Sequence, residues 1–116
     1  MNEGEGSTRT PQRVASVTRL LPDKEAEYRE LHIAVWPGVL AALKRANISN
    51  YTIFLRDGYL FSYLEYWGDD YNADYGRMAA EEVFRDWWKL TDPCQAPLPT
   101  AGNERWAPAE EVFHLD

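Results

Sequence analysis

At 116 residues, the chain is long enough for one domain that buries roughly two thirds of the surface of its unfolded form. Its formal net charge of −7 disfavours partners that present negative charge, so we expect no nucleic acid and no membrane surface as a partner. Cys94 is the single cysteine, which excludes an internal disulfide and a thiolate metal cluster. The aromatic content of 14% suits a core, but also a sugar site or a subunit interface.

The start of the chain, residues 1–11, is rich in Gly, Ser and Glu and closes with Pro11. We expect a flexible tail there, followed by a single domain over residues 12–116. The start lacks a basic segment followed by an apolar core, and no run approaches the ~20 apolar residues of a membrane span. We therefore expect a cytoplasmic location.

A strand and an interrupted helix come next. Residues 13–20 favour a strand, and Asp23 is the expected N-cap of the helix that follows. We expect Pro37 to interrupt this helix, because proline lacks an amide donor and pushes Trp36 out of the helical conformation. A second helical segment then carries apolar residues at helical spacing, namely Val39, Leu40, Leu43 and Ala46.

Two strands, 51–55 and 59–67, flank Asp57-Gly58, a pair that predicts a tight hairpin. Alternation along the second strand puts five residues on one face: Tyr59, Phe61, Tyr63, Glu65 and Trp67. If that face is buried, the Glu65 carboxylate needs a partner, and burial would raise its pKa.

A further helical region follows Gly68 and carries an apolar stripe made of Val83, Phe84, Trp87 and Leu90. Residues 92–108 hold four of the seven prolines and are expected to form a loop, and residues 111–115 to form a last strand. The order β-α-β-β-α-β predicts an α+β, ferredoxin-like fold with helices on one face of an antiparallel sheet. No element remains to cover the other face, so we expect a homodimer whose sheets pack face to face as a dimeric α/β barrel.

Tyr28, His32 and Trp36 recur at spacings of four, so on a helix they form one stripe. An imidazole has an unperturbed pKa of about 6.5, which suits acid–base chemistry near neutrality, although a lone histidine on a helix is more often structural. Trp87 and Trp88 would point about 100° apart on a helix, so they fit either a core or the stacking surface of a sugar site. The histidine spacing predicts no metal site, and motifs for dinucleotides, phosphate loops and serine hydrolases are absent from the sequence.

Four ordered motifs within residues 13–115 resemble the L-rhamnose mutarotase family: 28–37, 50–54, 87–93 and 110–115. The resemblance implies a dimeric α/β barrel that interconverts the α and β anomers of L-rhamnopyranose without a metal or a cofactor. It implies His32 as the catalytic general acid, and it implies four substrate-binding residues: Tyr28, Tyr51, Trp87 and Trp88.

The chain departs from some members at Ile33-Ala34, where they have Asn-Pro, and the segment 68–85 is longer and more acidic than in compact members. A related 6-deoxy sugar such as L-fucose therefore stays open as the substrate. Two other functions also stay open: a cofactor-free monooxygenase of the dimeric α/β-barrel type, since one fold hosts many chemistries, and a non-catalytic sugar-binding dimer. Glu65 is a further candidate partner for His32 or for a substrate hydroxyl.

Overall fold

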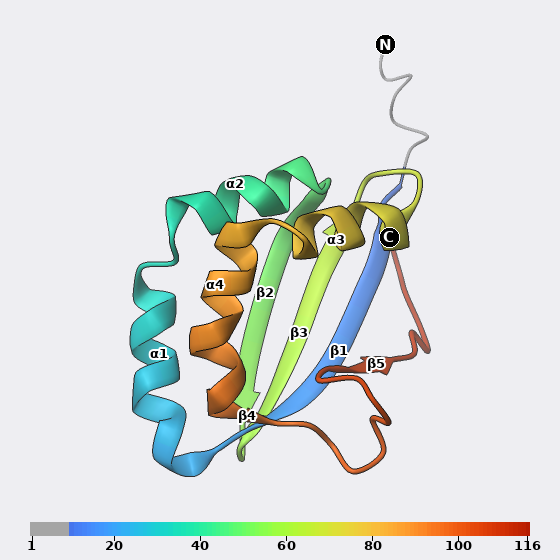
Figure 1. Cartoon of the computed structure of the whole chain (residues 1–116). Coiled ribbons are helices and arrows are strands. Elements are labelled where there is room, and N and C mark those ends of the chain that lie inside the picture. The colour runs from blue at the N-terminus through green and yellow to red at the C-terminus, as the bar shows by residue number, and fades with distance from the viewer. Residues whose placement is uncertain (1–9) are drawn as a thin grey trace.

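The computed structural model describes residues 10–116, so the flexible tail predicted at 1–11 lies outside the described residues except for its last two. Four helices gather on one side of an antiparallel sheet (Figure 1). The helices are α1 (Glu25–Ile33), α2 (Pro37–Arg45), α3 (Tyr71–Ala79) and α4 (Glu82–Thr91). The strands are β1 (Gln12–Leu20), β2 (Ile48–Arg56), β3 (Tyr59–Tyr66), β4 (Gln95–Ala96) and β5 (Ala107–Ala109).

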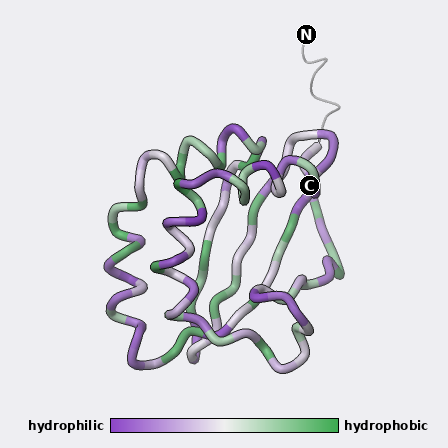
Figure 2. The backbone as a smooth tube through the Cα atoms, viewed as in Figure 1, coloured by the Kyte–Doolittle hydropathy of each residue, from purple (hydrophilic) through white to green (hydrophobic). Residues whose placement is uncertain are grey.

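The strand order is β2-β3-β1-β4, and β5 also pairs with β1. Along the helices, hydrophilic and hydrophobic residues alternate within each turn, as expected for helices with one face on a core (Figure 2). The predicted α+β arrangement is confirmed. The first helical region is interrupted as predicted, into α1 and α2, and the second is also split, into α3 and α4, which was not predicted.

The break between α1 and α2 lies where Pro37 predicted it. Trp36 has φ −57° and ψ 134°, which is extended backbone, and Pro37 then occupies the first turn of α2. The predicted N-cap at Asp23 is wrong, because a short 3-10 turn over Pro22–Lys24 precedes α1 and the capping residue is Lys24.

The hairpin between β2 and β3 is confirmed. Asp57 and Gly58 have φ values of 53° and 80°, the left-handed conformation that a two-residue hairpin turn requires at both positions. Further along β2, the register shifts between Ser49 and Thr52, so that Asn50 and Tyr51 together oppose one residue of β3. This bulge turns Tyr51 toward the helices rather than toward the opposite face of the sheet.

The alternation predicted for β3 is confirmed: its even-numbered residues are buried beneath the helices and its odd-numbered residues lie on the outer face of the sheet. Phe61 is 43% exposed there, and its partner on β2, Phe54, is 60% exposed. Glu65 is on this outer face as well, where hydrogen bonds from Asn50 Nδ2 (2.6 Å) and the Tyr63 hydroxyl (2.8 Å) lower the pKa of its carboxyl. Glu65 is therefore not a partner of His32 within one subunit.

The last strand predicted at residues 111–115 is wrong. The end of the chain pairs with β1 through β5, and residues 110–116 then continue without strand structure. The side chains of Val112 and Phe113 are exposed, while Glu111 accepts two hydrogen bonds from Arg13 at 2.9 and 3.0 Å. A strand needs a neighbouring backbone to satisfy its amides and carbonyls, and residues 110–116 find none within one chain. The segment 92–108, predicted as a loop, contains β4 and the start of β5.

Candidate active site

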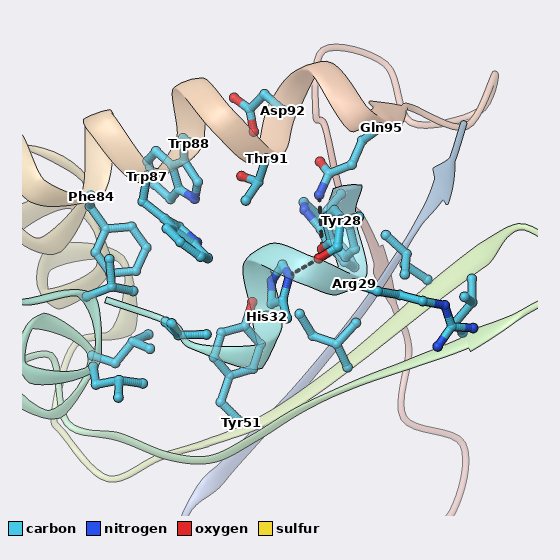
Figure 3. Close-up of a pocket in the computed structure, with 18 residues that line it drawn as sticks. Tyr28, Arg29, His32, Tyr51, Phe84, Trp87, Trp88, Thr91, Asp92 and Gln95 are labelled. Carbon is cyan, nitrogen blue, oxygen red and sulfur yellow. Dashed lines mark hydrogen bonds between the residues drawn. The ribbon is translucent and has the colours of Figure 1, made fainter. Parts of the chain in front are cut away.

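A cavity of about 420 Å³ lies between the sheet and the helical layer. Its lining includes all five residues that the family resemblance implied: Tyr28, His32, Tyr51, Trp87 and Trp88 (Figure 3). These come from α1, from the bulge of β2 and from α4, which are elements far apart in the sequence. The volume is in the range of small-molecule sites, and the lining combines aromatic rings with a few polar groups, as such sites do.

His32 is held by its own helix. Its Nδ1 atom lies 2.8 Å from the backbone carbonyl oxygen of Tyr28, so the Nδ1 proton is donated there. The imidazole ring lies between two aromatic rings, with centroid distances of 4.4 Å to Tyr28 and 5.5 Å to Trp87. Nε2 is thereby left as the ring nitrogen that can exchange a proton with a ligand in the cavity.

The two site tyrosines differ in their surroundings. Tyr28 is buried, its hydroxyl oxygen accepts a hydrogen bond from Gln95 Nε2 at 3.3 Å, and burial raises its pKa to about 12. Tyr51 is 43% exposed as a whole, but its hydroxyl end is buried at the cavity, which raises the pKa of this phenol strongly. Both phenols therefore stay protonated near neutrality and can donate hydrogen bonds to a ligand.

The two tryptophans also differ. Trp87 is buried and packs edge-on against Trp36, with 5.1 Å between the ring centroids, while it also contacts His32. Trp88 is half-buried and packs against Phe84 at a centroid distance of 5.1 Å. Trp36 thus supports the site from behind through Trp87, and Trp87 belongs to the core while it also borders the cavity.

Sequence reasoning missed several lining residues that come shortly after the tryptophans in the chain, among them Asp92 and Gln95. Gln95 is only 7% exposed, and among residues 10–116 its Oε1 atom has no hydrogen-bond partner. Asp92 is half-buried, and its Oδ1 lies 3.4 Å from Arg105 Nε. Burial raises the pKa of the Asp92 carboxyl, although Arg105 partly offsets this effect. The prolines around these residues indicated a loop, and nothing in that pattern placed the two side chains at a cavity.

Other chemistries find little support in the described part of the chain. Cys94 is buried and its thiol donates a long hydrogen bond to the Leu90 carbonyl (3.6 Å), while burial raises its pKa and keeps it protonated. Within residues 10–116, no three or more His, Cys, Asp and Glu side chains cluster as metal ligands would. No helix in that range combines the length and the apolar character needed to cross a membrane.

The sequence profile of the L-rhamnose mutarotase family matches residues 13–115. The chain belongs to the L-rhamnose mutarotase family. It is 35% identical over 106 residues to the L-rhamnose mutarotase of Listeria monocytogenes serotype 4b (strain F2365), covering 90% of this chain and 98% of that protein. The predicted family is thus confirmed.

Solved structures agree with this assignment. The crystal structure of L-rhamnose mutarotase from Formosa agariphila is similar with a TM-score of 0.71 and 25% identity, covering 90% of this chain and 99% of that one. Tetracenomycin F2 cyclase from Streptomyces glaucescens is similar with a TM-score of 0.69 at 16% identity, covering 90% and 97% of the two chains. The second likeness concerns the fold alone, because unrelated chemistries share this architecture. The predicted ferredoxin-like α+β fold is confirmed.

Proposed function

We propose that this enzyme interconverts the α and β anomers of L-rhamnopyranose, with His32 as its general acid. The observation that carries the proposal is that His32 borders the cavity of a chain that belongs to the L-rhamnose mutarotase family. The Nδ1 atom of His32 donates a hydrogen bond to the Tyr28 carbonyl, so Nε2 remains for a sugar in a cavity lined by phenols and indoles.

Anomer exchange needs only proton transfers and a rotation. A proton reaches the ring oxygen, the anomeric hydroxyl loses a proton, and the bond between the ring oxygen and the anomeric carbon breaks. The open-chain aldehyde then rotates before it closes on the other face. An imidazole can donate the proton on opening and take it back on closing, so no cofactor or metal is required. Protonated Tyr28 and Tyr51 orient the sugar hydroxyls, and Trp87 or Trp88 stacks on the apolar face of the 6-deoxy sugar.

We also propose that the enzyme is a homodimer that acts in the cytoplasm. The outer face of the sheet carries exposed aromatic side chains from two neighbouring strands, including Phe54 and Phe61, which lie opposite each other in the register. The exposed side chains of Val112 and Phe113 add apolar surface at the C-terminus. A second copy that packs its own sheet against this outer face would remove both apolar surfaces from water. Burial of apolar surface is the main favourable term in protein association.

Saturation-transfer NMR on the sugar tests the proposed activity. The wild-type protein should accelerate exchange between the two anomers of L-rhamnose, and His32→Ala should reduce the catalysed rate by roughly 100- to 10,000-fold. A comparison of L-rhamnose, L-fucose and D-galactose identifies the sugar that the cavity accepts. An unchanged rate in His32→Ala would contradict the role of His32.

Two further measurements, read together with the NMR result, separate the alternatives. Sugar-dependent quenching of tryptophan fluorescence without faster anomer exchange would select a non-catalytic sugar-binding dimer. Oxygen uptake with phenolic substrates, and no effect on sugars, would select a cofactor-free monooxygenase of the same fold.

A further inference from the structure

Anomer exchange requires two proton transfers in each ring opening, and His32 can provide only one of them at a time. One proton must reach the ring oxygen while another leaves the anomeric hydroxyl. The Nδ1 atom of His32 is committed to the Tyr28 carbonyl at 2.8 Å, so a single nitrogen faces the ligand. A second group at the cavity must therefore act as the base when opening is concerted.

The lining of the cavity leaves one candidate for this base. Its titratable side chains, among the residues that the structure describes, are those of Tyr28, Arg29, His32, Tyr51 and Asp92. The two phenols are buried and stay protonated, because burial raises the pKa of each, that of Tyr28 to about 12. Arginine remains a cation at any pH of interest. Asp92 is the remaining group that can take up a proton near neutrality.

The position of Asp92 suits this role. It directly follows α4, and in Figure 3 it lies on the wall of the cavity opposite His32, which belongs to α1. Arg105 holds it twice: Nη1 donates to the Asp92 backbone carbonyl at 3.1 Å, and Nε lies 3.4 Å from the carboxylate. A ligand between the two walls has an imidazole on one side and a carboxylate on the other.

The surroundings of Asp92 also raise the pKa of its carboxyl. Burial raises the pKa of its carboxyl, and the nearby Arg105 cation limits the rise. Among residues 10–116, the other titratable groups that interact with its charge are the phenols of Tyr28 and Tyr75. A carboxylate that ionises at neutral pH, yet holds a proton more tightly than an exposed aspartate, is suited to general base catalysis.

We propose that Asp92 is the base that accepts the proton of the anomeric hydroxyl while His32 protonates the ring oxygen. This assignment rests on the proposed mutarotase function. On opening, the bond between the anomeric carbon and the ring oxygen breaks, the anomeric oxygen becomes a carbonyl oxygen, Asp92 becomes neutral and His32 loses one proton. On closing, the former ring oxygen attacks the other face of the carbonyl carbon and returns its proton to His32. Asp92 then returns its own proton to the carbonyl oxygen, so both groups are regenerated.

The test compares Asp92→Asn with Asp86→Asn, a matched control on α4 whose carboxylate is exposed and pairs with Lys89. Anomer exchange of L-rhamnose is measured by saturation-transfer NMR from pH 3.5 to 9. We expect Asp92→Asn to lower kcat by roughly 100- to 10,000-fold with little change in KM, and Asp86→Asn to match the wild type. Added formate should restore part of the rate in Asp92→Ala, because a small carboxylate can occupy the vacated space.

A second variant keeps the carboxylate and changes only its charge environment. The wild-type rate should fall at low pH as Asp92 becomes protonated, and Arg105→Met should move this acidic limb to higher pH by removing the cation. A kcat for Asp92→Asn within about threefold of the wild type overturns the assignment, as does an acidic limb that Arg105→Met does not shift. A wild-type protein that leaves anomer exchange at its spontaneous rate refutes the proposed function instead.

Discussion

Gln95 donates a hydrogen bond from Nε2 to the hydroxyl oxygen of Tyr28 across 3.3 Å, which joins β4 to α1 inside the molecule. The amide of Gln95 is buried, and this is the bond that its nitrogen makes within the described residues. The Tyr28 hydroxyl therefore accepts a hydrogen bond within the fold, and because Tyr28 also borders the cavity, the same hydroxyl can donate a hydrogen bond to a ligand.

Removal of this hydroxyl should affect stability as well as activity. Tyr28→Phe leaves the buried Gln95 amide without its partner, which should lower the free energy of unfolding by about 1–3 kcal/mol. Tyr51→Phe is the matched variant, because the Tyr51 hydroxyl also lies at the cavity but shows no hydrogen bond to Gln95. Both variants should raise KM for the sugar, and urea unfolding should separate them. Equal unfolding free energies for the two variants would contradict this prediction.

The outer face of the sheet should control assembly. Phe54 is 60% exposed and lies opposite Phe61. Phe54→Glu would place a charge in the centre of a face-to-face sheet interface, where it would lose its hydration without gaining a partner. We expect this variant to be a monomer by light scattering coupled to gel filtration, while the wild type is a dimer. Ile33→Glu, at a position at the end of α1 that is more exposed than Phe54, should remain a dimer. A monomeric wild type would refute the proposed assembly.

The stability of the protein should fall in acid through Asp74. Hydrogen bonds from the Tyr66 hydroxyl, Arg77 and Asn47 lower the pKa of this carboxyl to about 2. A carboxyl whose pKa is depressed in the folded state stabilises the fold above its unfolded pKa, and this contribution is lost as the pH falls through the folded pKa. The wild type should therefore lose stability between about pH 4 and pH 2. Asp74→Asn should be less stable at pH 7 and should lose less over that window in urea unfolding. A variant that loses as much as the wild type would contradict the assignment.

The contact between α2 and α4 depends on the absence of a side chain at Gly38. An added Cβ there would lie 2.9 Å from Val83 Cγ2, which is too close for an unstrained contact. Gly38→Ala should cost about 1–3 kcal/mol through overpacking, and the double variant with Val83→Ala should recover part of this loss.

Gly76, in the middle of α3, has open space where an added Cβ would lie. Gly76→Ala should therefore stabilise the protein by about 0.5–1 kcal/mol. In urea unfolding, the free energy of unfolding should fall for Gly38→Ala and rise for Gly76→Ala.

Local sequence rules predicted the elements that depend on nearby residues. Pro37 determined where the first helix ends, because its ring and missing amide act on the adjacent turn. Asp57-Gly58 determined the hairpin, because both positions adopt the left-handed conformation that these residues tolerate. The last strand could not be placed in this way, because pairing depends on which backbone edge is free rather than on the residues of the segment.

The site shows the same division. The motifs that resemble a family identified His32, Tyr28, Tyr51, Trp87 and Trp88, and all five border one cavity. They did not single out Asp92 or Gln95. Asp92 directly follows α4, and Gln95 comes to that cavity where β4 pairs with β1. Strand alternation placed Glu65 on the correct face of β3, but it could not show that this face lies away from the helices and from His32.

The sequence by itself determined the family, the helix break, the hairpin and the residues that carry the motifs, because each of these is encoded within a few neighbouring positions. Only the tertiary structure decided which carboxylate lies opposite His32 at the cavity. That relationship joins α1 to the end of α4, and contacts between distant elements depend on packing, bulges and strand pairing that no local pattern specifies.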